Sequence, residues 1–240
     1  MMLELKGVSS QYDEKVVVLR DISMKVQERS TTCVLGPNGA GKTTLVKTIV
    51  NLVRPRKGEI TFSGVRIERL RTHQIIKLGI SVVPEGRQLF PKLTVAETLR
   101  MGAYFENDSR VIRERTEKVS EIFPIIKERI QQLAGTLSGG ELGMLSIARA
   151  LMAEPKMVIL DEPSLGLSPI MTSRVFKTIQ EINARGITIL LIEQNARKSL
   201  RISSYGYIIQ KGEVVGQGDV SSLKESEIVK KAYLRGRDKA

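Results

Sequence analysis

One eight-residue segment constrains the fold of this chain more than any other feature. Residues 36–43 read Gly-Pro-Asn-Gly-Ala-Gly-Lys-Thr and match the pattern G-x-x-x-x-G-K-S/T. An apolar strand-like run, residues 31–35, precedes the segment, and Leu45, Ile49 and Leu52 follow it at helical spacing. A strand, a glycine-rich loop and a helix in this order place backbone N–H groups and a positive helix end around a phosphate. The alternative is a glycine-rich turn before a helix, but the match and its place between strand and helix favour nucleotide binding.

Within this loop, each residue type has an expected task. Lys42 would reach the β- and γ-phosphates of a nucleotide, and the hydroxyl of Thr43 would hold Mg²⁺. The glycines let successive N–H groups point inward. The residues that we expect to bind the nucleotide here are Gly36, Pro37, Asn38, Gly39, Ala40, Gly41, Lys42, Thr43 and Thr44.

A second acidic motif stands far downstream, where the apolar run Met157 to Leu160 ends in Asp161 and Glu162. Asp161 would complete the Mg²⁺ site, and Glu162 would polarise the water that attacks the γ-phosphate. Solvated acids at the end of a strand are the alternative interpretation. The phosphate loop upstream favours the catalytic one.

The segment Leu137-Ser138-Gly139-Gly140-Glu141 lies between these two motifs and precedes a predicted helix. A serine and two glycines at a helix N-terminus form a second site suited to an anion, although a good N-cap after a flexible turn would look the same. The order of phosphate loop, helical stretch, L-S-G-G-E, apolar strand and Asp-Glu resembles the ATP-binding subunits of ATP-binding-cassette (ABC) transporters. The resemblance covers nearly the whole chain.

The resemblance implies an α/β fold with a P-loop NTPase (RecA-like) core, an N-terminal antiparallel β-subdomain and a helical insert. The whole chain, residues 1–240, is then a single ABC ATP-binding domain. Residues 1–87 and 157–240 form the nucleotide-binding core, and residues 88–156 form the helical subdomain. The sequence patterns agree: helices are predicted over 43–52, 109–123, 140–153 and 169–185, with one starting at the capping box of Thr94 and Glu97.

The resemblance also implies that two copies pack head to tail. Ser138, Gly139 and Gly140 of one copy then close over the ATP that the phosphate loop of the other copy holds. Tyr12 matches the aromatic residue that stacks on adenine, although a tyrosine at a strand end would be expected there too.

Two positions depart from the usual family pattern. Glu85 stands where a glutamine normally contacts Mg²⁺ and the attacking water, and Gln194 stands where a switch histidine normally contacts the γ-phosphate. Gln194 can hydrogen-bond a phosphate oxygen but carries no charge. His73, the only histidine, is expected on a surface helix, and Gly143 and Met144 replace the glutamines expected after the signature.

These departures narrow the resemblance to one subgroup. Residues 84–87 (Pro-Glu-Gly-Arg), residues 90–95 (Phe-Pro-x-Leu-Thr-Val) and residues 192–196 (Ile-Glu-Gln-Asn-Ala) are similar to the second ATPase of high-affinity branched-chain amino-acid importers. Importers of urea and amides have similar sequences. The resemblance implies ATP and Mg²⁺ as cofactors, catalysis by Glu162, Lys42 and Gln194, and a metal site of Thr43, Asp161 and Glu85.

The implied partners are a second ATP-binding subunit, integral-membrane permease subunits that contact the helical subdomain and the Glu85 loop, and indirectly a periplasmic or extracellular solute-binding protein. The chain would then lie peripherally on the cytoplasmic face of the membrane. Two other functions remain open: a soluble ABC ATPase that acts on nucleic acid or the ribosome, and an ATP-binding regulatory partner with little turnover.

Composition decides between these only in part. The formal charge of +12 fits nucleic acid, acidic lipid headgroups or plain solubility. With no Trp and 4% aromatic residues, no stacking platform for bases stands out, so no nucleic-acid partner is expected. The longest apolar run, residues 187–192, is far shorter than the ~20 residues of a membrane span, and the single cysteine, Cys33, excludes an intrachain disulfide.

Overall fold

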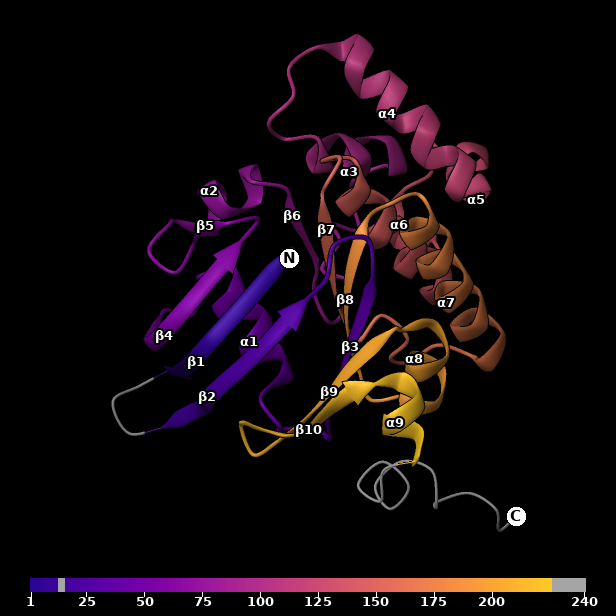
Figure 1. Ribbon diagram of the computed structural model, residues 1–240. Coiled ribbons are helices and arrows are strands. Elements are labelled where there is room, and N and C mark those ends of the chain that lie inside the picture. Colours follow the sequence, from indigo (N-terminus) through magenta and orange to yellow (C-terminus); the bar gives the residue numbers. More distant parts are fainter. Residues whose placement is uncertain (13–15, 226–240) are drawn as a thin grey trace, which may run out of the picture.

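The computed structural model describes residues 1–12 and 16–225, and its frame consists of two β-sheets (Figure 1). In the described residues the first sheet is antiparallel, with four strands in the order β2-β1-β4-β5. These strands are β1 (Leu3–Gln11), β2 (Val17–Val26), β4 (Pro55–Phe62) and β5 (Val65–Arg66). The predicted N-terminal antiparallel part of the fold is therefore confirmed.

The second sheet carries the nucleotide motifs. Its order, within the described residues, is β10-β9-β3-β8-β7-β6, and only the β9–β10 pair is antiparallel. Every residue of β3, β7 and β8 is buried, which explains why the middle of each strand is continuously apolar rather than alternating. The strands are β3 (Thr31–Leu35), β6 (Ile80–Val83), β7 (Met157–Asp161), β8 (Thr188–Glu193), β9 (Tyr205–Gln210) and β10 (Glu213–Asp219).

The two faces of the second sheet belong to different cores. Val34 points into a core shared with the first sheet and with Leu45 and Ile49 of helix α1 (Lys42–Ile49), so α1 lies between the two sheets. Cys33 and Leu35 point into the opposite core, which helices cover. These helices include α6 (Gly139–Leu151), α7 (Pro169–Ala184), α8 (Ala196–Ile202) and α9 (Val220–Glu225).

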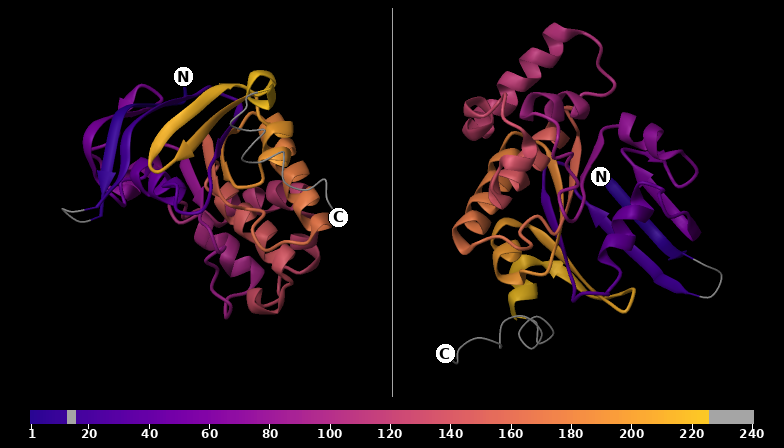
Figure 2. Two further views of the ribbon diagram at one scale, coloured as in Figure 1. Left: turned by 90° about the horizontal axis from the view of Figure 1, so that it is seen from below. Right: turned by 180° about the vertical axis from the view of Figure 1, so that it is seen from behind.

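Helices fill the stretch between β6 and β7. They are α3 (Val95–Gly102), α4 (Ser109–Ile122), α5 (Pro124–Glu128), the 3-10 turn η1 (Ala134–Thr136) and α6. The predicted capping box starts α3: the Thr94 hydroxyl accepts from the Glu97 N–H at 3.2 Å, and the Glu97 carboxylate accepts from the Thr94 N–H at 2.8 Å. Helix α4 lies far from the β1–β2 edge of the first sheet in every view (Figure 2).

The structure adds elements that the sequence patterns did not predict. Helices α5 and α8 were not predicted, and α2 (Thr72–Lys77) was expected only as a surface helix that carries His73, without bounds. His73 is exposed on α2, as expected. Near the C-terminus, residues 224–239 form a basic stretch in which the spacing of Ile228, Ala232 and Leu234 predicts a helix. All of this stretch except its first two positions lies outside the described residues. In the described part of the chain, no helix has both the length and the apolar character needed to span a membrane.

Candidate nucleotide-binding site

The phosphate-loop segment, residues 36–43, joins β3 to α1 and is too tightly packed for side chains at two of its glycines. A Cβ at Gly36 would lie 2.6 Å from the carbonyl oxygen of Ile209. Gly41 has a φ of 104°, which side-chain-bearing residues rarely adopt, and it is the N-cap of α1. No side chain caps this helix end, and the first turn holds no acidic residue. The N-terminus of α1 is therefore suited to an anionic ligand.

Lys42 is the first residue of α1, and its ammonium group has three close acceptors. It donates to the carbonyl oxygens of Gly36 at 2.8 Å and Pro37 at 3.0 Å, and it lies 2.9 Å from a carboxylate oxygen of Glu162. The Lys42 and Glu162 side chains are 5% and 7% exposed. Since an ammonium group has three protons, a phosphate oxygen that binds Lys42 must replace one of these acceptors.

Asp161 ends β7, two strands away from the phosphate loop, and its carboxylate is buried. Burial, together with repulsion from Glu85 and Glu162, raises the pKa of Asp161 to about 6, although a hydrogen bond from the Thr43 hydroxyl opposes this. Its Oδ1 atom has no hydrogen-bond partner among residues 1–12 and 16–225. A buried carboxylate with a free oxygen beside a hydroxyl is a suitable ligand set for a hard cation.

Glu162 follows directly and adopts a φ of 49°, which is uncommon for a residue with a side chain. Its N–H donates to the carbonyl oxygen of Ile192 at 2.9 Å, which ties the loop after β7 to the end of β8. A non-glycine residue held in this conformation at a strand end is a frequent feature of functional sites.

A cavity of about 330 Å³ lies against the phosphate loop and is lined by eight of the predicted residues. The predicted residues in its lining are Asn38, Gly39, Gly41, Lys42, Thr43, Thr44, Glu85 and Glu162. Val18 and Leu165 complete the lining and were not predicted. Glu85 is therefore close enough to the phosphate loop to share a ligand with it.

Tyr12 stands at the edge of this region with its side chain largely exposed. Its hydroxyl lies 3.3 Å from the hydroxyl of Thr44, and the ammonium group of Lys47 lies 5.7 Å from the centre of its ring. The structure thus brings the predicted aromatic residue next to the first turn of α1, with a ring face available for stacking.

The signature residues do not line the phosphate-loop cavity of their own chain. Ser138 caps α6, where its hydroxyl accepts from the Glu141 N–H at 3.4 Å and its own N–H donates to the Glu141 carboxylate at 2.7 Å. Ser138 and Gly139 are exposed, whereas Gly140 is buried against Met171. Ser138 is therefore the N-cap of α6, a position that both interpretations of the segment require, and it and Gly139 are exposed.

Gln194 is exposed at the end of β8 and is not part of the cavity lining either. The residue before it, Glu193, is buried and binds the backbone N–H groups of Gln194, Asn195 and Ser164. Glu193 was not among the site residues predicted from the sequence. An acidic residue at the end of an otherwise apolar strand was the available signal, the same signal that identified Asp161.

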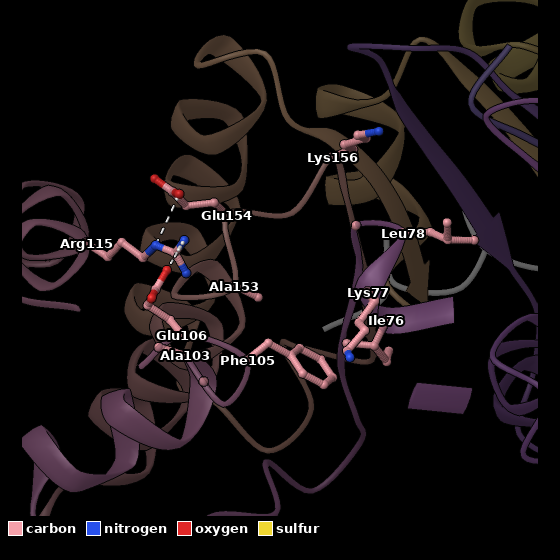
Figure 3. A pocket seen from close by; sticks show the side chains of 12 residues that line it. Ile76, Lys77, Leu78, Ala103, Phe105, Glu106, Arg115, Ala153, Glu154 and Lys156 are labelled. Carbon is pink, nitrogen blue, oxygen red and sulfur yellow. Dashed lines mark hydrogen bonds and ion pairs between the residues drawn. The ribbon is translucent and has the colours of Figure 1, made fainter. Parts of the chain in front are cut away.

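A second cavity, of about 400 Å³, lies apart from the phosphate loop, between α2, the end of α3 and the segment before β7 (Figure 3). Arg115 of α4 forms ion pairs across one side of it with Glu106 at 3.4 Å and Glu154 at 3.1 Å. On the other side, the ammonium group of Lys77 lies 4.9 Å from the centre of the Phe105 ring. This cavity therefore combines an exposed aromatic face with charged groups.

The buried strand β3, the glycine-rich loop and the lysine that meets the carboxylate just after β7 define the chain as a P-loop nucleoside triphosphatase. Comparison with known proteins narrows the class. A family model described as ABC transporter matches residues 19–165, and the chain belongs to this family of transporter ATPases.

Relatives and solved structures agree along nearly the whole chain. The high-affinity branched-chain amino acid transport ATP-binding protein BraG of Pseudomonas aeruginosa is 40% identical over 98% of this chain and 100% of its own. The lipopolysaccharide export system ATP-binding protein LptB of Haemophilus influenzae is 35% identical over 97% of both chains. The crystal structure of an ABC transporter ATP-binding cassette in its ADP conformation superposes with a TM-score of 0.87 at 25% identity, covering 97% of this chain and 98% of that one. The predicted resemblance and fold class are confirmed.

Proposed function

We propose that this ATPase powers a high-affinity importer of branched-chain amino acids. The observation that carries the proposal is the 40% identity to BraG, which extends over 98% of the chain. LptB, an export protein, is 35% identical over a similar span, so lipopolysaccharide export is the competing candidate. Urea and amide import is a further alternative within the subgroup.

In the proposed reaction, ATP binds with its phosphates in the loop and at the N-terminus of α1. A γ-phosphate oxygen takes the place of the Glu162 carboxylate at Lys42, which frees Glu162 to accept a proton from water. The water oxygen attacks the γ-phosphorus, the bond to the β-phosphate oxygen breaks, and ADP and phosphate leave. Gln194 contributes a neutral hydrogen bond to a phosphate oxygen.

Mg²⁺ fits the oxygen atoms that this site offers. Among the described residues, Asp161 has a buried oxygen without a partner, and the Thr43 hydroxyl adjoins this carboxylate. Glu85 lines the phosphate-loop cavity together with Thr43. When bound with ATP, the ion would neutralise charge on the phosphates. In the described part of the chain, no group of three or more His, Cys, Asp or Glu forms an all-protein cage. Nucleotide-bound Mg²⁺ does not need one, because phosphates and waters supply most of its ligands.

The signature supports an assembly of two ATP-binding subunits. Ser138 and Gly139 are exposed and lie outside the phosphate-loop cavity of their own chain, so a second copy is needed to bring such a surface over the nucleotide. Tyr12 would stack on the adenine of the ATP that its own chain holds. We also propose that residues 1–87 and 157–240 form the nucleotide-binding core and residues 88–156 the helical subdomain, as the resemblance to ABC ATP-binding subunits implies.

Permease subunits would bind through the helical subdomain and the Glu85 loop. This part of the chain carries exposed apolar side chains on and beside α3, namely Phe90, Met101, Tyr104 and Phe105. The cavity in Figure 3 opens beside Phe105. In this arrangement the chain lies peripherally on the cytoplasmic face of the membrane, contacts a solute-binding protein only through the permease, and needs no nucleic acid.

Solute uptake by cells tests the proposal. Cells that lack this chain, cells that express it and cells that express Glu162→Gln at the same level are compared for uptake of labelled leucine, isoleucine, valine and urea. We expect uptake of the branched-chain amino acids to be restored by the wild-type chain alone. Unchanged amino-acid uptake in the deletion strain, or a defect confined to urea uptake or to the lipopolysaccharide of the outer membrane, would refute it.

A further inference from the structure

Glu193, the last residue of β8, is a buried carboxylate with no part in the reaction as described above. Its side chain is 2% exposed. In the sheet register it lies beside Leu35, the residue before the phosphate loop, and its neighbour Ile192 lies beside Asp161. Glu193 therefore stands at the strand ends that carry the catalytic groups.

Its two carboxylate oxygens accept three backbone hydrogen bonds. Oε1 accepts from the N–H of Ser164 at 3.0 Å, and Oε2 accepts from the N–H groups of Gln194 at 3.1 Å and Asn195 at 3.2 Å. A buried carboxylate is stable only when it is paired or hydrogen-bonded, and three amide donors meet this need. The chemistry thus requires an acceptor with two oxygens at this position.

These donors come from two separate loops. Ser164 lies two residues after Glu162, and Gln194 is the residue at the switch position. The Glu162 N–H also donates to the carbonyl oxygen of Ile192 at 2.9 Å, so the two loops are joined at neighbouring points. A shift of either loop would move the proposed base relative to Lys42.

We propose that Glu193 is a positioning residue, whose carboxylate holds the loop of Glu162 and the loop of Gln194 in register for hydrolysis. The inference rests on the proposed role of Glu162 as the base. Within the described residues, the hydrogen bonds of Glu193 go to Ser164, Gln194 and Asn195 and not to the phosphate loop, so ATP binding does not depend on it. Its loss affects the chemical step.

Glu193→Gln in the full chain is the test variant, since it keeps the size of the side chain and turns one acceptor into a donor. Glu117→Gln, an exposed glutamate on α4, is the matched control. ATP hydrolysis is measured well below the melting temperature of each variant, with the permease subunits present if the isolated chain does not turn over. We expect kcat to fall at least tenfold in Glu193→Gln, with the Kd for ATP within about twofold of the wild-type value. The control should match wild type in both.

A double-mutant cycle with Glu162→Gln separates this inference from the proposed function. If Glu193 acts through Glu162, adding Glu193→Gln to Glu162→Gln should leave the residual rate unchanged. ATP hydrolysis at the wild-type rate in Glu162→Gln would refute the proposed role of Glu162 as the base. If Glu162→Gln hydrolyses ATP slowly but Glu193→Gln has the wild-type kcat, only the positioning role of Glu193 is refuted.

A second variant tests whether a loss of activity in Glu193→Gln results from misfolding. Glu193→Asp keeps the charge but withdraws the carboxylate from its donors, and we expect the same loss of kcat with ATP binding intact. If both variants fail to fold or lose ATP binding together with turnover, Glu193 is a structural residue and the proposal is overturned.

Discussion

Replacing Glu162 by glutamine should lower both the free energy of unfolding and the Kd for ATP. The Lys42 ammonium group uses all three protons, on two carbonyl oxygens and on the Glu162 carboxylate at 2.9 Å. Removing one partner of a buried ion pair typically costs about 3–5 kcal/mol. Glutamine keeps an acceptor at the same place, and both carbonyl contacts remain, so we expect a smaller loss of unfolding free energy, about 1–3 kcal/mol. The relief of repulsion between Glu162 and Asp161 favours the lower end of this range.

The same contact opposes nucleotide binding, because a phosphate oxygen must displace the carboxylate from Lys42. If the free energy of that displacement falls by about 1–3 kcal/mol, the Kd for ATP should fall about fivefold or more. ATP at 100 times its Kd adds about 2.7 kcal/mol to the free energy of unfolding, which would offset most or all of the loss relative to the nucleotide-free wild-type chain.

Thermal unfolding with and without ATP and Mg²⁺ measures both effects. At this chain length, each kcal/mol corresponds to roughly 2–4 °C in Tm, so the Tm of Glu162→Gln without ATP should fall by several degrees. Calorimetry gives Kd, and phosphate release gives turnover, which should be lost. The exposed Glu117→Gln serves as control. An unchanged Tm together with weaker ATP binding would refute this account of the Lys42–Glu162 pair.

Three further predictions follow from other contacts. Gly36→Ala should weaken ATP binding at least tenfold, because its Cβ would lie 2.6 Å from a backbone carbonyl oxygen, whereas Gly218→Ala, whose Cβ would make an ordinary 3.8 Å contact with the Cβ of Ser222, should leave the Kd unchanged. Tyr12→Phe loses only the 3.3 Å contact with the Thr44 hydroxyl, so its Kd for ATP should be within about twofold of the wild-type value. Tyr12→Ala also loses the stacking, and its binding free energy for ATP should be weaker by about 1–3 kcal/mol. Equal affinities for the two variants would contradict adenine stacking. Burial raises the pKa of Cys33 to about 11, so its thiolate is scarce at neutral pH, and iodoacetamide should label it only in urea; mass spectrometry showing labelling of the native chain would contradict this.

The sequence predicted those parts of the site whose signals are local. Strand β3, the phosphate loop and α1 are adjacent in the chain, so their pattern reveals both their structure and their order. Asp161 and Glu162 were predicted because an apolar strand ends in acids, and the structure places Glu162 beside Lys42. Long-range contact between these motifs followed from the parallel sheet, in which carboxyl ends share one edge.

Parts that depend on distant contacts were missed. Helices α2 and α8 have six and seven residues, too few for a clear helical period. The burial of Glu193 depends on an N–H donor from Ser164, which is 29 residues away and belongs to another loop. No periodicity or local motif could have identified that contact.

Gly143, which departs from the family pattern, lies beside the side chain of Arg87. The Arg87 guanidinium lies along the first turns of α6: a Cβ at Gly139 would be 3.1 Å from one of its nitrogens, and a Cβ at Gly143 would be 3.9 Å from Nε. A Cβ at position 143 would therefore be in ordinary van der Waals contact with Arg87. Arg87 also accepts a hydrogen bond from the Ser146 hydroxyl at its carbonyl oxygen (3.1 Å) and reaches the carbonyl oxygen of Leu165 at 3.5 Å. The loop after β6, the signature helix and the loop after Glu162 therefore meet around Arg87, so a substitution at Gly143 would change the surroundings of a residue that contacts all three.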